Sequence, residues 1–475
     1  MPVTRAEARL GKSILIFSDG TGQRGGVQFE ERRSNIYKLY RATRCGPDSC
    51  IDPLEQVAFY DAGIGTVPGG ITGIGRIGRR LYNLIGQATG LGLTANIVDC
   101  YAAIIRVWEP GDRIFLFGFS RGAYTVRCVG GVLALCGVPT LGKGSTPLKR
   151  DPASAGRLAK KAVKRVYQHF RPSKAGPDAL RGALAARFRA EHRSDIDGRS
   201  NAFPYFIGVF DTVASLANRK ILVALAVILV AVLVGASVGL SYVVWTFWCW
   251  LLLLVGIAVG IVGASYLATH VKITFGLPRY HWWQTLRLTK WRMQFYDRDL
   301  NPNVGYARHA LAIDERRADF IRVPWGSPKI WKETQPIWFE QIWFAGNHSD
   351  IGGSYLEDES RLSDIALKWI VDAAQSVPDG NKIDPSVLRL YPSAAGMQHD
   401  ETKRGLFSLA QKFRLARRIT REIPDDAILD DSVYQRGRIA AILNYDVTEP
   451  YRPQGLTGHV EFQRRCGQTG AEQPT

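Results

Sequence analysis

Short apolar runs bounded by glycine, aspartate and serine recur along this chain of 475 residues. Their length and their β-branched and aromatic content predict strands. Between them, apolar residues recur at the three- and four-residue spacing of helices that bury one face. The alternation of the two kinds of segment predicts an α/β fold with a mainly parallel sheet flanked by helices. The expected strands are 13–17, 56–60, 113–118, 205–210 and 337–345, and the expected helices are 33–43, 94–108, 123–136, 307–320, 362–374 and 406–421.

The segment 118–122, with the sequence Gly-Phe-Ser-Arg-Gly, joins an expected strand to an expected helix. A serine between two glycines at such a turn is the G-x-S-x-G nucleophile elbow, whose glycines leave room for a strained backbone and an exposed hydroxyl. The pattern favours Ser120 as a nucleophile over an ordinary tight turn. The backbone N–H of Arg121, at the start of the helix, would then face a developing oxyanion.

Two further residues follow expected strands and complete a possible triad. Asp211 directly follows strand 205–210, although an aspartate there could simply cap the next helix. His348 follows strand 337–345 and lies in a glycine-rich loop that could bring it over the sheet. The order Ser, Asp, His is that of α/β-hydrolases. In that chemistry the imidazole takes the serine proton, and the acid orients and stabilises the imidazolium.

Asp350 is an alternative acid because it lies only two residues from His348. Such close spacing makes it hard for the carboxylate to approach the imidazole. Asp350 is therefore expected to support the active site by holding the glycine loop at 352–353.

Two glycine-rich loops could bind an anion. The loop 18–22 follows the first expected strand and could offer the backbone N–H groups of Gly20 and Thr21 to an oxyanion, with Asp19 in support. A plain Asp-Gly turn is the alternative there. Residues 73–78 match the dinucleotide pattern G-x-G-x-x-G but do not directly follow a strand, so no cofactor is expected. No cysteine or histidine spacing indicates a metal site.

The stretch 221–271 contains no Asp, Glu, Lys or Arg. It divides into 221–240 and 247–268, each long enough as a helix to cross a hydrocarbon core of about 30 Å. An inserted transmembrane hairpin is therefore expected, with a buried helical pair or a re-entrant hairpin as alternatives. Aromatic residues at the bend suit an interfacial belt. These are Tyr242, Trp245, Trp248 and Trp250.

The formal charge of +18 is concentrated between Arg150 and Arg199, where basic amphipathic helices are expected. Such an excess suits an anionic membrane or a nucleic acid. No nucleic-acid fold signature is present, so a lipid surface is the expected partner and nucleic acid is not; an ordinary solvated basic face is the alternative for this stretch. Basic residues on both sides of the apolar stretch place the soluble parts on the cytoplasmic side of an inner membrane. Seven scattered cysteines fit free thiols in a reducing compartment, and the N-terminus lacks the apolar core of a signal peptide.

Several segments together resemble a known family. They read FSDGTGQ, YDAGIGT, GDRIFLFGFSRGAYTVR, GVFDTV, ARHALAIDERR and WFAGNHSDIGGSY, and they span residues 14–355. The chain resembles the α/β-hydrolase family of type VI secretion phospholipase effectors and their bacterial and fungal relatives. The resemblance implies an acyl-ester hydrolase acting on phospholipids, with Ser120, Asp211 and His348 as triad and the loop at 19–21 in the active-site floor. Asn347 and the hairpin depart from the family pattern.

The expected protein is thus a membrane-anchored serine hydrolase that cleaves carboxylic esters of lipids, as a phospholipase or lysophospholipase. The alternative is a non-catalytic, membrane-anchored binding or scaffold protein on a hydrolase fold. Protein partners are left open. The expected division is a hydrolase domain in two parts, 1–218 and 273–377, separated by the hairpin at 219–272 and followed by a C-terminal extension at 378–475.

Overall fold

The computed structural model describes residues 11–20, 32–63, 91–170, 178–213, 219–242, 246–288, 299–318, 320, 322–326, 331–403, 411 and 417–467. Thr21 and the glycine pattern at 73–78 lie outside these residues, so the predictions made for them stay predictions.

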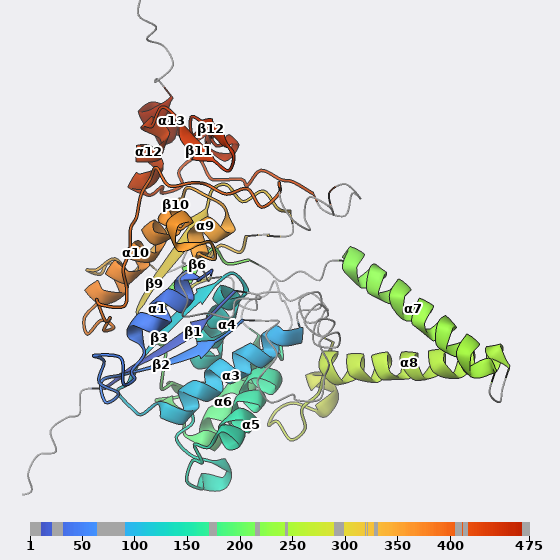
Figure 1. Ribbon diagram of the computed structural model, residues 1–475. Coiled ribbons are helices and arrows are strands. Elements are labelled where there is room, and N and C mark those ends of the chain that lie inside the picture. Colours follow the sequence, from blue (N-terminus) through green and yellow to red (C-terminus); the bar gives the residue numbers. More distant parts are fainter. Residues whose placement is uncertain are drawn as a thin grey trace, which may run out of the picture.

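Within the described residues, six parallel strands form the central sheet, which confirms the predicted α/β fold (Figure 1). β3 lies inside the sheet, between β1 and β6. Because all strands run in one direction, their carboxyl ends meet at one edge, where α/β proteins place ligands. In spatial order the strands are β10 (Phe339–Phe344), β9 (Tyr306–Ala312), β6 (Pro204–Phe210), β3 (Arg113–Phe119), β1 (Ser13–Ser18) and β2 (Gln56–Asp61).

Helices cover both faces of the sheet, so its strands are buried on both sides. Successive side chains of a strand point to opposite faces. In β1, Ile14 and Ile16 pack with one helical layer, and Leu15 and Phe17 pack with the other. The first layer contains α3 (Leu91–Val107), α4 (Arg121–Cys136), α5 (Pro152–Lys161), a π-helical turn (Ala162–Tyr167) and α6 (Ala179–His192), and the second contains α1 (Asn35–Thr43) and α10 (Arg361–Ser376).

The prediction of a helix at 307–320 is wrong, because this segment begins with strand β9. A strand buried on both faces reads as a nearly continuous apolar run, which also matches helical spacing. The charge within the run is neutralised across the sheet. Nε of Arg308 lies 2.9 Å from a carboxylate oxygen of Glu340 on the neighbouring strand β10.

Two long helices, α7 (Arg219–Ser241) and α8 (Phe247–His270), occupy the predicted hairpin and project from the body (Figure 1). Many of their apolar side chains are exposed, among them Val232 and Leu252. The expected crossing of a membrane is not supported. Crossing requires about 20 consecutive apolar residues, and no helix offers such a stretch among the side chains that the structure describes.

The C-terminal extension packs onto the β10 edge of the sheet (orange to red in Figure 1). Its segment around Leu429 pairs with Trp343 of β10, and Phe462 and Cys466 are buried with Trp343 in one cluster. A polar tail is expected from the sequence beyond residue 452, but the described chain is folded there as far as Gly467. Its elements are α12 (Asp431–Arg438), β11 (Ile442–Asn444), β12 (Val447–Glu449), a 3-10 turn (Gln454–Leu456) and α13 (Val460–Cys466).

The helix expected at 406–421 lies mostly outside the described residues. Its last part, 417–421, is not helical, because this segment pairs antiparallel with 316–318. The remaining short elements are α9 (His348–Gly352), the paired strands β4 (Asp195–Ile196) and β5 (Arg199–Ser200), the paired strands β7 (Val271–Lys272) and β8 (Arg287–Leu288), and the 3-10 turns Lys143–Ser145, Trp282–Thr285 and Glu357–Glu359.

Candidate active site

Ser120 lies in a strained turn between β3 and α4. Its φ of 58° and ψ of −120° are rare for a residue with a side chain. The two flanking glycines are required by close backbone approaches. A Cβ at Gly118 would lie 2.6 Å from the Cα of Ala123, and a Cβ at Gly122 would lie 1.9 Å from the carbonyl oxygen of Ser18. The local geometry is therefore that of a nucleophile elbow.

The loop after β1 lies beside this elbow. A Cβ built on Gly20 would be 3.5 Å from the Cβ of Ser120. The buried carboxylate of Asp19 accepts hydrogen bonds from Ser34 Oγ at 2.5 Å and Tyr60 Oη at 2.7 Å, which fix the loop. Burial raises the pKa of Asp19 to about 6, against the opposing effect of these hydrogen bonds. Arg121 is the first residue of α4, and burial lowers the pKa of its guanidinium to about 10.

Asp211 and His348 are in direct contact, although 137 positions separate them. Asp211 directly follows β6 and has a φ of 34°, and its Oδ2 lies 2.5 Å from Nδ1 of His348. His348 begins α9, whose N-cap is Asn347. The elbow is anchored at the same edge, because the backbone N–H of Ser120 donates to the carbonyl oxygen of Phe210 at 3.1 Å. The structure thus brings Asp211 and His348 into contact and places Ser120 at the same carboxyl edge of the sheet, while the roles of the three residues stay predictions.

The imidazole of His348 lies between two aromatic rings. The ring centroids of Phe119 and Phe320 are 4.6 Å and 4.8 Å from that of the imidazole. Nε2 of His348 is buried and makes no hydrogen bond within the described part of the chain. Burial lowers the pKa of His348 although Asp211 opposes this effect, so the ring is neutral near pH 7. A neutral, oriented imidazole whose Nε2 makes no hydrogen bond can act as a general base.

Asp350 is engaged elsewhere. Its Oδ1 lies 2.7 Å from Nδ1 of His399, and its Oδ2 accepts the backbone N–H groups of Asn347 and His399. Asp350 therefore closes the capping box of α9 and joins the loop of His348 to the C-terminal extension. In this geometry the acid that contacts His348 is Asp211.

Sequence reasoning missed three charged residues around this pair. Glu315 accepts the backbone N–H of His348 at 3.2 Å and is bound by the guanidinium of Arg317. Both residues stand in the motif ARHALAIDERR, which offered a signal for them. Arg421 contacts Asp211 directly, but a single arginine at the end of an expected helix carries no signal that sequence reasoning could use.

The electrostatics of Asp211 follow from burial and from these neighbours. Burial alone would raise the pKa of this carboxyl group. The charge of Arg421 and the hydrogen bond from His348 outweigh burial, so the pKa of Asp211 is well below its usual range. Asp211 is therefore an anion near neutral pH, as the acid of a triad must be.

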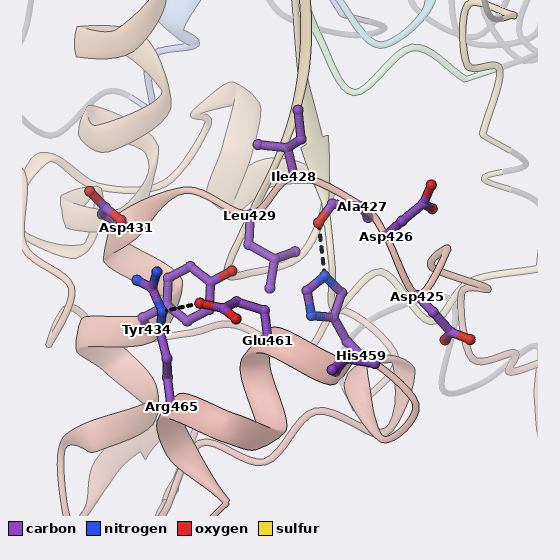
Figure 2. A pocket seen from close by; sticks show the side chains of 11 residues that line it. Asp425, Asp426, Ala427, Ile428, Leu429, Asp431, Tyr434, His459, Glu461 and Arg465 are labelled. Atoms are coloured by element: carbon purple, nitrogen blue, oxygen red, sulfur yellow. Dashed lines mark hydrogen bonds and ion pairs between the residues drawn. The ribbon is translucent and has the colours of Figure 1, made fainter.

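A cavity of about 570 Å³ lies in the C-terminal extension (Figure 2). Its lining combines aspartate and glutamate side chains with apolar residues such as Leu429, and it does not include Ser120, Asp211 or His348. In the same view, His459 contacts the carbonyl oxygen of Ala427 at 2.8 Å.

Within its described residues, the structure contains no group of three or more His, Cys, Asp and Glu residues that could hold a metal ion.

A family model for the catalytic domain of type 6 secretion system Tle1-like phospholipase effectors matches residues 12–238 and 259–373. These segments cover more than half of the chain and include Ser120, Asp211 and His348. The resemblance indicated by the sequence motifs is confirmed by this match.

Single proteins are similar over smaller shares of their length. The uncharacterized protein YEL023C of Saccharomyces cerevisiae is 36% identical over 139 residues, which are 28% of this chain and 19% of that protein. The solved structure of an uncharacterized protein from Pseudomonas aeruginosa is 17% identical and has a TM-score of 0.33. The match covers 79% of this chain and 47% of that protein's chain. A Tle1 effector bound to the VgrG spike of the type 6 secretion system, also 17% identical, has a TM-score of 0.28 and coverages of 74% and 53%. The chain thus spans about half the length of these two solved proteins.

Proposed function

The chain belongs to the Tle1-like phospholipase effector catalytic-domain family, and on this premise we propose that it is a serine hydrolase that cleaves carboxylic esters of phospholipids or lysophospholipids. The observation that carries the proposal is the position of the strained Ser120 at the sheet edge where Asp211 holds His348 with Nε2 open. Fold alone does not establish such an activity. The proposal rests instead on the chemistry of these three side chains.

In the first half of the reaction, Ser120 Oγ bonds to the ester carbonyl carbon while its proton passes to Nε2 of His348. Asp211 stabilises the imidazolium that forms. Backbone N–H groups at the start of α4 and in the loop of Gly20 would hold the oxyanion. The bond from the acyl carbon to the alcohol oxygen then breaks, and the alcohol leaves with the proton from His348.

In the second half, water replaces the alcohol. His348 takes a proton from the water as the hydroxide attacks the acyl-enzyme, and the proton returns to Ser120 as the fatty acid leaves. An acyl-enzyme on Ser120 is therefore an obligatory intermediate of this proposal.

Labelling with a fluorophosphonate probe tests the nucleophile. We expect the folded wild-type chain to be labelled and Ser120→Ala to be unlabelled, because the probe reacts with activated serine hydroxyls. Ser376→Ala is the matched control, since Ser376 is exposed at the end of α10 and should not affect labelling. A wild-type chain that resists the probe and hydrolyses no ester would instead favour the non-catalytic binding or scaffold protein.

We also propose that the α7–α8 hairpin holds the enzyme at a lipid surface. Val232 is 60% exposed, Leu252 is 72% exposed and Val259 is 67% exposed, so the hairpin presents apolar area that a monomer in water rarely exposes. Basic residues such as Lys272 and Arg279 flank it and suit an anionic leaflet. The seven cysteines form no disulfide, which supports a reducing compartment and hence the cytoplasmic side of an inner membrane.

Flotation with anionic phospholipid vesicles tests this attachment. Leu252→Glu together with Val259→Glu should weaken co-flotation, because charged groups resist transfer out of water. Leu54→Glu is the matched control, because Leu54 is 68% exposed on the body of the protein. Unchanged flotation of the double variant would rule out the hairpin as the attachment.

A further inference from the structure

Arg421 is buried beside the triad acid and binds it with both ends of its guanidinium. Nη1 donates to Asp211 Oδ1 at 2.6 Å, and Nη2 donates to Oδ2 at 2.9 Å. The same group donates to the carbonyl oxygens of Ala312 at 2.9 Å and Phe320 at 3.4 Å. One side chain therefore ties the ends of β6 and β9 to the residue whose ring contacts His348.

A fully buried carboxylate requires a counter-charge, because leaving it alone in the protein interior is costly. The ion pairs of Asp211 in the described part of the chain are with His348 and Arg421. Because burial keeps His348 neutral in the resting state, the permanent counter-charge comes from Arg421. The planar guanidinium fork also fixes the rotation of the carboxylate, which a single ammonium does not.

The chain around Arg421 is itself held in place. The backbone N–H of Ala318 donates to the carbonyl oxygen of Arg417 at 3.0 Å. The backbone N–H of Ile419 donates to the carbonyl oxygen of Arg316 at 2.8 Å. These bonds pair the segment 417–421 with the loop that follows β9. The position of the guanidinium is thus set by backbone pairing.

Arg421 lies outside the segments that match the family model, which end at residue 373. It belongs to the C-terminal extension. Through this contact the extension reaches Asp211, one of the three residues of the proposed triad.

We propose that Arg421 is a positioning residue that holds Asp211 in the orientation needed to support His348, so that the C-terminal extension completes the active site. This inference rests on the proposed function. Without the guanidinium, the negative charge of Asp211 would be less compensated, and the Asp211–His348 pair would hold a proton more tightly. The acid limb of the pH profile of kcat/KM should then move to higher pH.

Other charged and titratable groups surround the pair and remain in any Arg421 variant. Glu315 and Arg317 face His348, and Arg322 and His309 face Asp211. Because they are unchanged, a shift of the acid limb in the variants reports on Arg421.

The first experiment measures hydrolysis of a soluble short-chain ester by the full chain and its Arg421→Met variant across pH. We expect kcat to fall by about 10²-fold, the cost of a misplaced catalytic group, and the acid limb to move to higher pH. The matched control is Arg436→Met. Arg436 is also a buried arginine of the extension, but it donates to the carbonyl oxygens of Ala394 and Gly396. This control should lose stability without a shift of the acid limb. An Arg421→Met acid limb identical to that of the wild type would overturn the proposal.

The second experiment does not require Arg421→Met to fold. Arg421→Lys keeps the charge but loses the fork, and it is compared in the wild-type and Asp211→Asn backgrounds. If Arg421 acts through Asp211, Arg421→Lys should lower kcat in the wild-type background and change kcat little in the Asp211→Asn background. Equal losses in both backgrounds would mean a merely structural role. A wild-type chain with no Ser120-dependent hydrolysis would defeat the proposed function itself, which separates the two failures.

Discussion

Asp350 and His399 form a second carboxylate–imidazole pair, 2.7 Å apart, next to the pair of Asp211 and His348. The two pairs share one short segment of chain, because Asp350 lies two residues after His348. Each imidazole nevertheless has its own carboxylate. The chemistry proposed for this site therefore assigns different effects to the two acids.

Substitution of each acid separates these effects. Asp211→Asn should lower kcat by about 10⁴-fold, as removal of a triad acid does, with little change in fold. Asp350→Asn should mainly lower the midpoint of thermal unfolding, because it weakens the cap of α9 and the contact with His399. Both are measured by ester hydrolysis and circular dichroism. A folded Asp350→Asn variant without activity, beside an active Asp211→Asn, would reverse the assignment.

The pH dependence of stability should reflect the loop of Asp19 and the neighbouring Asp61. Burial raises the pKa of each carboxyl group to about 6. Because the unfolded chain releases these protons near pH 4, the stabilising contribution is fully present below that pH and is lost as pH rises through about 6. Asp61→Asn stays neutral, and its amide oxygen can still accept from Ser18 and Asn96.

We therefore expect Asp61→Asn to flatten the pH dependence of the unfolding free energy by on the order of 2 kcal/mol between about pH 4.5 and 7.5. Chemical denaturation of the variant and the wild type at both pH values measures this difference. Parallel curves for the two proteins would show that Asp61 does not titrate as argued.

The elbow should not tolerate a larger residue at Gly122. A Cβ there would lie 1.9 Å from the carbonyl oxygen of Ser18, so Gly122→Ala must displace β1 or the start of α4. We expect loss of fluorophosphonate labelling even where the protein remains folded. Gly182→Ala is the control, because a Cβ at this position of α6 meets nothing within 4 Å. It should stabilise the protein by up to about 1 kcal/mol and leave labelling intact.

Deletion of the hairpin should separate the chemistry from access to lipid. Replacing 221–271 by a short Gly/Ser linker should preserve hydrolysis of a soluble short-chain ester and strongly reduce hydrolysis of phospholipid in vesicles. Both rates are measured on the same preparation, with Ser120→Ala as the background. Equal loss on both substrates would mean that the hairpin is part of the folded body. No loss on either would remove its role at the lipid surface.

The parts of the site that could be predicted are those in which strand, turn and residue type coincide. Ser120, Asp211 and His348 each follow a strand whose apolar run is visible in the sequence, so topology alone brings them to one edge. The strand β9 could not be recognised, because a strand buried on both faces loses the alternation that distinguishes it from a helix. The apolar character of the hairpin was visible, but its crossing of a membrane is not supported by the structure.

Contacts made by single side chains over long distances could not be predicted. Arg421 ends a segment for which a helix was predicted, and His399 lies in a polar segment, so nothing local distinguishes either of them from a surface residue. Their partners are defined only when the extension packs on β10, through pairing of Leu429 with Trp343. Burial and charge compensation then determine which carboxylates Arg421 and His399 contact, and both effects depend on the complete fold.

The late position of Arg421 has a consequence for the order in which the protein matures. A ribosome extends the chain from its N-terminus, so Ser120, Asp211 and His348 all emerge before the residue that neutralises Asp211. Until the segment 417–421 has paired with 316–318, the carboxylate lacks its permanent counter-charge. A nascent or prematurely ended chain would therefore carry the three reactive side chains in an unfinished arrangement. For the proposed hydrolase, ester cleavage at the full rate would therefore begin only after the segment 417–421 has been synthesised and has paired with 316–318.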